Sequence, residues 1–197
     1  MMTDLGFVPG TPRPYFGGPS VHTLRIELQY VEPTVWRRFV VPSETKLPKF
    51  NRTLEAAMGW EGYHLHMFEI ADLRIGAPDE DDDDRIDERQ ITVKQLLPRV
   101  GSQVRWAYDF GDNWQHDVVV EAIEEPSPDV RYPMCTDGAR ACPPEDCGGV
   151  SGYEELREVL ADPLHPEHEH LREWAGAGFE PDVFDQIAVT KRLRRIR

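Results

Sequence analysis

The chain has 197 residues, of which 40% are hydrophobic, so it is long enough to bury one sizeable core. Its formal net charge is -14, and a strongly acidic chain repels phosphate backbones, which argues against a broad nucleic-acid-binding face. No apolar run approaches the length that crosses a bilayer, and the N-terminal sequence has no apolar segment typical of a signal peptide. We therefore expect a cytoplasmic protein without membrane contact.

The first residues are rich in Pro and Gly, and we expect residues 1–20 to form a flexible arm ahead of one ordered domain over residues 21–197. Apolar and polar residues alternate over residues 21–30, which predicts a half-buried strand. Residues 34–42 follow a Pro-containing turn and are predicted to pair with that strand as a hairpin.

An amphipathic helix is predicted in the segment KLPKFNRTLEAAMGW. Leu47, Phe50, Leu54 and Met58 recur at helical spacing on one face, and Gly59 is placed to end the helix. The following segment, HLHMFEIADLRIG, is predicted to return to extended structure.

An acidic loop is predicted at residues 77–88. Its run of acidic residues, Asp79 to Asp84, is interpreted as solvated, with cation capture as the alternative. The segment TVKQLLPRV then predicts a short helix with Thr92 as its cap.

A β-hairpin with an aromatic inner face is predicted in QVRWAYDFGDNWQHDVVVEAIEE, with its turn at GDN. The inward-facing residues are predicted to be Val104, Trp106, Tyr108 and Phe110 on the first strand and Trp114, His116, Val118 and Val120 on the second.

Helices are predicted to dominate the C-terminal part of the chain. Ser151 and Glu154 have the spacing of a capping box, Pro166 is placed at the first position of another helix, and residues 181–197 predict a final short helix. Strands that precede clustered helices favour the α+β class, as a single domain with a mainly antiparallel sheet packed against several short helices.

All three cysteines lie in one loop, residues 135–149, with the spacing Cys-x6-Cys-x4-Cys. Cys135, Cys142 and Cys147 are candidate ligands of a structural zinc, with the fourth ligand unassigned and a histidine able to supply it. The competing interpretation is a Pro- and Gly-rich turn with small buried thiols. Glu145 and Asp146 in the same loop are candidate oxygen ligands or caps. A redox role is disfavoured because the chain has no C-x-x-C motif.

Histidines supply a second candidate site. His64 and His66 would point to the same face of a strand, and His116 lies on a strand predicted to be its neighbour. Three imidazoles on one sheet face would suit a catalytic zinc with an open position, with Asp109 or Asp112 at the hairpin turn as an orienting group or general base. The competing interpretation is that each histidine makes an ordinary polar contact.

Two further features are given structural interpretations. The tract HPEHEH, with His165, His168 and His170, looks like a metal-binding tract, but it is interpreted as the exposed start of a helix. A helix would turn His168 and His170, two residues apart, to different sides, which disfavours a shared metal. The basic residues 191–197 suggest contact with nucleic acid only weakly, since such a tail is more often the exposed side of a last helix.

Several segments together resemble a known family: LRIELQYVEPTVWRRFVVP, LEAAMGWEGYHLHMFEI, YDFGDNWQHDVVVE, CTDGARACPPEDCGGVSGYEELREVLADPLHPEHEHLREWAG and FEPDVFD. They closely resemble the plasmid Ri (pRi) open-reading-frame-three-like proteins, a family also named the passenger TnpR family of an insertion element. The resemblance spans residues 21–197 and implies a single α+β domain of plasmid or mobile-element origin with no established reaction. Resolvase activity is not inferred, because the chain has no serine-recombinase pattern and is strongly acidic.

Three functional hypotheses follow. The leading one is a non-enzymatic accessory or interaction protein with a protein partner, whose Cys loop braces the sheet against the C-terminal helices through zinc. The alternative is a metal-dependent hydrolase that uses His64, His66 and His116. The third is a nucleic-acid-binding module that uses residues 191–197. Convergence of the three histidines in an open cleft would favour the hydrolase.

Overall fold

The computed structural model describes residues 18–79, 82–176 and 178–196. Most of the expected flexible arm, residues 1–17, therefore lies outside the described residues. At the end of that arm, the carbonyl oxygen of Ser20 accepts a hydrogen bond of 2.9 Å from the backbone N–H of Ser43.

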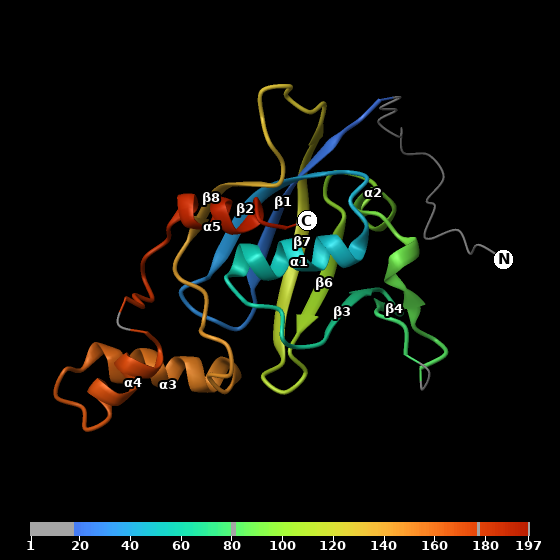
Figure 1. Ribbon diagram of the computed structural model, residues 1–197. Helices are drawn as coiled ribbons and strands as arrows, with labels where there is room; N and C mark the ends of the chain where they lie inside the picture. Colours follow the sequence, from blue (N-terminus) through green and yellow to red (C-terminus); the bar gives the residue numbers. More distant parts are fainter. Residues whose placement is uncertain (1–17, 80–81, 177, 197) are drawn as a thin grey trace.

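The core of the molecule is one eight-stranded sheet in the described part of the chain, with the strand order β5-β4-β3-β6-β7-β1-β2-β8 (Figure 1). Neighbouring strands are antiparallel except β4 and β5, which are parallel. The strands are β1 Val21–Leu28, β2 Trp36–Pro42, β3 His66–Ile70, β4 Leu73–Gly76, β5 Ile86–Asp87, β6 Gln103–Tyr108, β7 Trp114–Glu124 and β8 Met134–Ala139. The α+β class with a mainly antiparallel sheet is confirmed.

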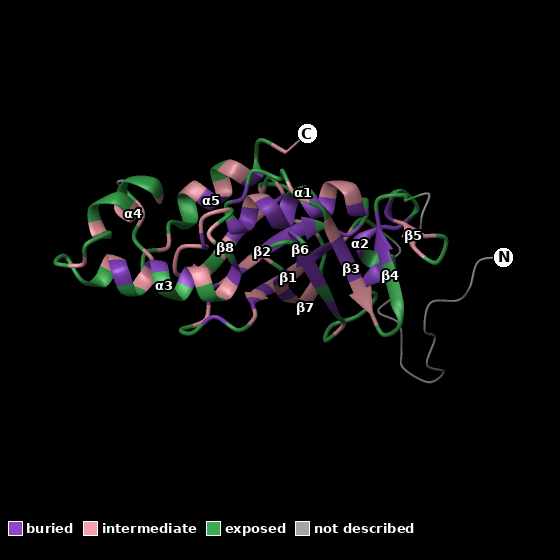
Figure 2. Cartoon of the chain, turned by 90° about the horizontal axis from the view of Figure 1, so that it is seen from below, coloured by how far each residue is buried: buried purple, intermediate pink, exposed green. Residues whose placement is uncertain are grey.

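Helices α1 and α5 cover one face of the sheet, while α3 and α4 lie beyond its β8 end (Figures 1 and 2). The helices are α1 Leu47–Met58, α2 Val93–Leu96, α3 Gly149–Ala161, α4 His168–Trp174 and α5 Gln186–Leu193, with a 3-10 turn at Glu88–Gln90. No helix in the described ranges is both long and apolar enough to cross a membrane.

The predicted apolar stripe of α1 packs onto the sheet. Leu47, Phe50, Leu54 and Met58 are all buried. Gly59 ends the helix in the left-handed conformation, with φ 105°, which glycine adopts without a steric penalty. The helix and its termination are therefore as predicted from the periodicity.

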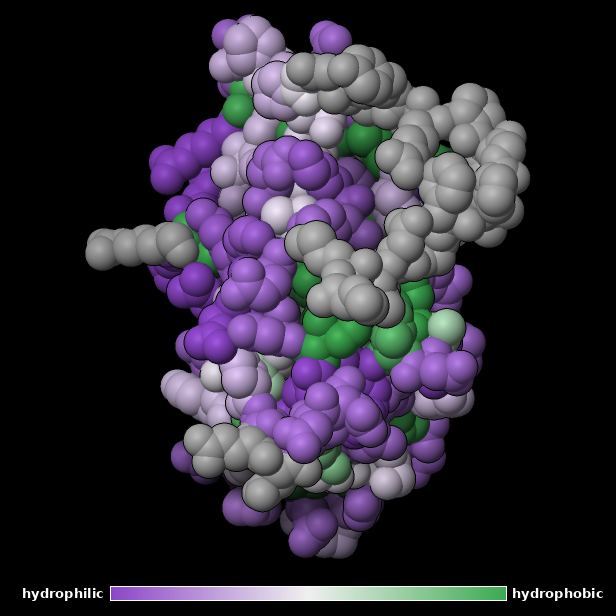
Figure 3. All heavy atoms as spheres, turned by 90° about the vertical axis from the view of Figure 1, so that its right-hand side faces the viewer, coloured by the Kyte–Doolittle hydropathy of each residue, from purple (hydrophilic) through white to green (hydrophobic). Residues whose placement is uncertain are grey.

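The opposite face of the sheet carries charged side chains. The Arg25 guanidinium lies 3.8 Å from the centre of the Trp36 ring, and Arg38 forms ion pairs with Glu121 and Asp137. An antiparallel sheet can leave one face to solvent when that face is polar in this way. A hydrophilic surface also prevails on the side that includes β4, where it is interrupted by a hydrophobic patch (Figure 3).

Four local predictions are wrong. The first strand was expected to reach residue 30, but β1 ends at Leu28, and Tyr30 is 73% exposed with a positive φ of 65°. Phe110 is 49% exposed because Asp109 takes a positive φ of 55° and β6 ends at Tyr108. Ser151 lies inside α3, which begins at Gly149 after Gly148 as its N-cap. Helix α4 begins at His168, so Pro166 precedes it rather than opening it.

The acidic loop is more structured than predicted. Its last residues form β5 and the start of the 3-10 turn, and residues 80–81 lie outside the described residues. Asp82 forms ion pairs with Arg74 at 2.8 Å and with Arg85 at 3.1 Å. Part of the acidic run is thus neutralised by neighbouring arginines instead of being free to capture a cation.

Candidate functional site

The Cys loop folds against the β6–β7 hairpin and the end of α1. Glu145 links these elements, because its carboxylate accepts a 2.5 Å hydrogen bond from the Tyr108 hydroxyl and a 3.2 Å bond from the Glu61 backbone N–H. Burial is the main cause that raises the pKa of Tyr108, with a further contribution from Glu145. The Tyr108 hydroxyl therefore stays protonated and serves as a permanent donor.

An aromatic cluster packs beside this junction. The ring of Trp60 stacks on Tyr108 with 4.7 Å between centroids, and its edge meets His116 at 5.2 Å. The indole N–H of Trp60 also donates a 3.0 Å hydrogen bond to the carbonyl oxygen of Pro143. One buried side chain thus ties the Cys loop to the sheet, which fixes where the acidic residues of that loop lie.

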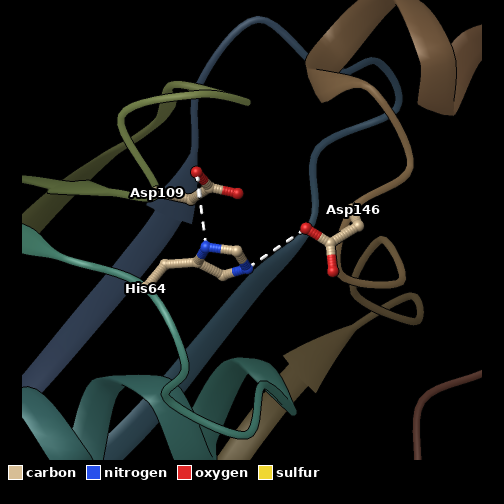
Figure 4. Close-up of side chains that lie close together, drawn as sticks. All are labelled: His64, Asp109 and Asp146. Carbon is tan, nitrogen blue, oxygen red and sulfur yellow. Dashed lines mark ion pairs between the residues drawn. The ribbon is translucent and has the colours of Figure 1, made fainter.

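His64 lies between two carboxylates at this junction (Figure 4). Its Nδ1 is 3.6 Å from Asp109 Oδ1, and its Nε2 is 3.2 Å from Asp146 Oδ1. Asp109 is buried, whereas the Asp146 side chain is 71% exposed. The imidazole therefore has a carboxylate from the interior on one nitrogen and a carboxylate from the surface on the other.

One metal ion cannot contact both nitrogens of one imidazole. At most one of the two carboxylates could therefore bind the same ion as His64. Asp109 Oδ1 lies near Nδ1 but beyond hydrogen-bond distance, and it accepts a 2.9 Å hydrogen bond from the Gly111 backbone N–H. Nε2 and the exposed Asp146 carboxylate are then the other pair. Nε2 is itself buried and makes no hydrogen bond within the described residues, although Asp146 Oδ1 lies 3.2 Å away as an ion-pair neighbour.

No other group of this kind forms in the described ranges. Three or more histidine, cysteine, aspartate or glutamate ligand atoms come within 4.8 Å of one another only at His64, Asp109 and Asp146. Asp109 and Asp146 both have positive φ, 55° and 58°. Uncommon backbone conformations of non-glycine residues gather at functional sites, and here two of them belong to one group of three side chains.

The three histidines of the predicted catalytic zinc site do not converge. His64 precedes β3 instead of lying on it, since that strand begins at His66. The Nε2 of His66 pairs with Glu88 Oε2 at 2.7 Å, while His116 is fully buried with its Nδ1 3.1 Å from the Trp106 carbonyl oxygen. The register does place His66 and His116 on one face, but each imidazole is engaged by a different neighbour.

The two aspartates of the hairpin turn have separate roles. Asp109 approaches His64, with 3.6 Å between its Oδ1 and the imidazole Nδ1. Asp112 instead accepts a 3.1 Å hydrogen bond from the backbone N–H of Gly148 and so attaches the hairpin turn to the start of α3.

The three cysteines do not form a ligand group either. Cys135 lies on β8, where its thiol donates a hydrogen bond to the Asp137 carbonyl oxygen at 3.3 Å. The chain continues from Cys135 as an extended strand to Ala139. Burial raises the pKa of the Cys142 thiol and of the Cys147 thiol to about 12 in each case. Cys135 is buried, whereas Cys142 and Cys147 are partly buried.

The basic tail is part of α5 and the turn that follows it. Arg192 is directed into the fold, where its Nε donates a 3.1 Å hydrogen bond to the Ala56 carbonyl oxygen. Arg194 and Arg195 are exposed, and Arg197 lies outside the described residues. Contact with nucleic acid through this tail stays a prediction.

The pairing of Asp146 with His64 was not expected from the sequence. From the sequence, Asp146 is a candidate ligand or cap for its own loop, the Cys loop. The sequence assigns no particular partner to Glu145. The only local signal is that both loops place an acidic residue at a turn, in YDFGD and in PPEDCGG. Which turn faces which histidine depends on how the loops pack.

The chain is similar to known proteins over most of its length. A model of the family described as "Plasmid pRiA4b ORF-3-like protein" matches residues 20–188. The chain is 40% identical over 160 residues to "Uncharacterized protein y4hQ" of Sinorhizobium fredii (strain NBRC 101917 / NGR234), which covers 80% of this chain and 82% of that protein. The crystal structure of "Protein of Unknown Function MM3350 from Methanosarcina mazei Go1" matches with a TM-score of 0.78 and 38% identity, covering 85% of this chain and 96% of the other.

Proposed function

The chain belongs to the plasmid pRiA4b ORF-3-like protein family, and we propose that it is a non-enzymatic accessory protein that binds a divalent metal ion at His64 and Asp146. The observation that carries this proposal is the imidazole of His64 between two carboxylates, with Asp109 near Nδ1, and with Asp146 Oδ1 3.2 Å from an Nε2 that makes no hydrogen bond within the described residues. Imidazole and carboxylate together suit zinc, manganese or a similar ion, with water in the remaining positions.

The surroundings of His64 support an accessory role over enclosure of a small substrate. Tyr63 is 78% exposed, Leu65 is 67% exposed and Phe110 is 49% exposed, and the three adjoin His64 or Asp109 in sequence. Sites for small molecules are concave and cover most of the ligand surface. An exposed centre flanked by exposed apolar side chains suits contact with a protein partner, which the metal would help to position.

Metal titration tests the proposal. Isothermal titration calorimetry of the tag-free protein with Zn²⁺ and with Mn²⁺ is expected to give one site, weakened at least about tenfold by His64→Ala and by Asp146→Asn. Asp109→Asn should weaken binding less, because it removes a neighbouring charge and not a ligand. His170→Ala, which removes an exposed imidazole outside the site, is the matched control. Equal binding by wild type and His64→Ala would refute the site.

A second candidate function is metal-dependent hydrolysis, favoured by the 71% exposure of Asp146, which leaves the metal open to water. It predicts turnover of chromogenic esters, such as p-nitrophenyl acetate and bis(p-nitrophenyl) phosphate, that requires the metal and is lost in His64→Ala. Metal binding without such turnover would leave the accessory role as the function. Turnover that survives in His64→Ala would come from another source.

A further inference from the structure

A cavity of about 420 Å³ lies between the end of α1, helix α5 and the Cys loop. Its lining combines two arginines with aromatic side chains, namely Arg37, Trp60, Phe179, Phe184 and Arg192. The volume falls in the usual range for small-molecule sites. The proposed metal group is not part of this lining, so the cavity is a separate feature.

Arg37 is an anomaly in the sheet. It occupies an inward-facing position of β2, between buried neighbours at Val35 and Phe39, and is itself only 2% exposed. Its guanidinium donates to three backbone carbonyl oxygens, those of Trp36 and Ala139 through Nη1 and that of Ala57 through Nε. Carbonyl groups satisfy hydrogen bonds but do not neutralise a buried charge.

Arg192 brings a second positive charge to the same cavity. Its Nε is held by the Ala56 carbonyl oxygen at 3.1 Å, and its Nη2 lies over Gly59. Within the described parts of the chain, neither Arg37 nor Arg192 forms an ion pair with a carboxylate. Burial lowers the pKa of Arg37, and repulsion by nearby Arg192 acts in the same direction.

Three carboxylates also line the cavity, but each is engaged elsewhere. Glu145 accepts from Tyr108 and from the backbone of Glu61, and Glu180 pairs with Arg172 at 3.1 Å. Asp185 caps α5 by accepting a 2.9 Å hydrogen bond from the backbone N–H of Ala188. In a chain of net charge -14, two neighbouring guanidiniums thus remain without a counter-charge.

Aromatic side chains pack around these arginines. The ring of Phe184 lies 4.8 Å from the Arg37 guanidinium carbon, stacked over its charge. Phe184 also packs over Gly138, where an added Cβ would lie 2.6 Å from the ring. Phe179 and Trp60 complete the aromatic part of the lining.

We propose that this cavity binds a small molecule that carries an oxyanion, a carboxylate or a phosphate, on an aromatic or apolar body. Arg37 and Arg192 would receive the oxyanion, which supplies the missing counter-charge, and guanidinium groups match both anions with paired hydrogen bonds. Phe179 and Phe184 would contact the body of the ligand. The proposal does not depend on the metal site, because no residue of that site contributes to the cavity.

Calorimetric titration with phenyl phosphate, benzoate and inorganic phosphate, in buffer with a chelator to remove metal, tests this proposal. At least one of the two aromatic anions is expected to bind with a Kd of about 1 mM or below, and more tightly than inorganic phosphate. The stronger of the two identifies the oxyanion. Arg192→Ala should weaken that binding at least about tenfold. Arg194→Ala removes an exposed arginine directly after α5 and should leave the affinity within about twofold of the wild type.

Arg192→Lys guards against a folding defect in Arg192→Ala. It keeps the positive charge and the aliphatic stem but loses the planar fork, so binding should weaken severalfold while the circular dichroism spectrum stays that of the wild type. Absence of binding by both aromatic anions would overturn the proposal. Unchanged affinity in both folded Arg192 variants would overturn it as well.

Discussion

Gly149 lies against the backbone of Asp112, so that a Cβ atom at position 149 would come within 2.6 Å of the Asp112 carbonyl oxygen. The Asp112 carboxylate accepts a 3.1 Å hydrogen bond from the neighbouring Gly148 N–H. These two contacts fasten the β6–β7 turn to the start of α3. Asp109 on one segment and Asp146 on the other are thereby brought to the two sides of His64.

The first prediction concerns this fastening. Gly149→Ala introduces both a backbone clash and an unfavourable positive φ, since Gly149 has φ 68°. We expect a loss of about 2–4 kcal/mol in the free energy of unfolding, measured by urea denaturation. Gly101→Ala is the matched control, because Gly101 has φ 81° but open space around its Cα, and should cost about 1 kcal/mol. Equal losses would mean that the contact with Asp112 has no energetic weight.

The second prediction separates the two neighbouring histidines. His66→Ala leaves the Glu88 carboxylate, which is 5% exposed, without its 2.7 Å partner, and should destabilise the fold by about 3 kcal/mol. His64→Ala should cost less than about 1 kcal/mol, because the His64 side chain is partly exposed and its partners are longer contacts. Guanidinium chloride unfolding at pH 7 measures both. Recovery of stability in His66→Ala/Glu88→Gln would identify the stranded carboxylate as the cause.

The third prediction is a dependence of stability on pH. Burial lowers the pKa of His116 to about 3 in the folded state, whereas an exposed histidine in the unfolded chain has a pKa near 6.5. The unfolded chain therefore binds more protons between these values, and stability falls as the pH drops below about 6.5. From pH 7 to pH 5 the wild type should lose about 2 kcal/mol more than His116→Gln. His22, whose pKa burial also lowers, titrates in both proteins and so cancels in this difference.

Parallel urea titrations at the two pH values provide the measurement for His116. If the wild type and His116→Gln lose the same stability on acidification, protonation of His116 does not require unfolding, and the ring is more accessible than its 0% exposure indicates.

The fourth prediction concerns the thiols. Burial raises the pKa of Cys142 to about 12 and also raises that of Cys135, so little thiolate is present at pH 8. We expect both to react with 5,5′-dithiobis(2-nitrobenzoate) at least about a hundredfold more slowly in the native protein than in 6 M guanidinium chloride. Single Cys→Ser variants assign each kinetic phase to its residue. A fast native phase that is lost in Cys142→Ser would show a reactive thiol there.

Much of the fold was predictable from local patterns. The alternation in β1, the helical spacing in α1 and the aromatic face of the β6–β7 hairpin each indicate which side of an element is buried, and the burial agrees within the bounds of these elements but not at Tyr30 and Phe110 beyond them. The errors at Phe110, Ser151 and Pro166 share another cause. They lie where an element begins or ends, and there the backbone conformation of one residue, such as Asp109 with its positive φ, decides the boundary.

The sequence by itself determined the α+β class, the order of the main elements and the buried faces, because periodicity depends only on neighbouring residues. The tertiary structure alone decided that His64 meets Asp109 and Asp146, and that Arg37 and Arg192 share one cavity. These residues come from segments far apart in the chain, and their meeting depends on how the Cys loop and α5 pack onto the sheet. Side-chain packing between distant segments leaves no periodic trace in a single sequence, which is why both proposed sites became visible only in three dimensions.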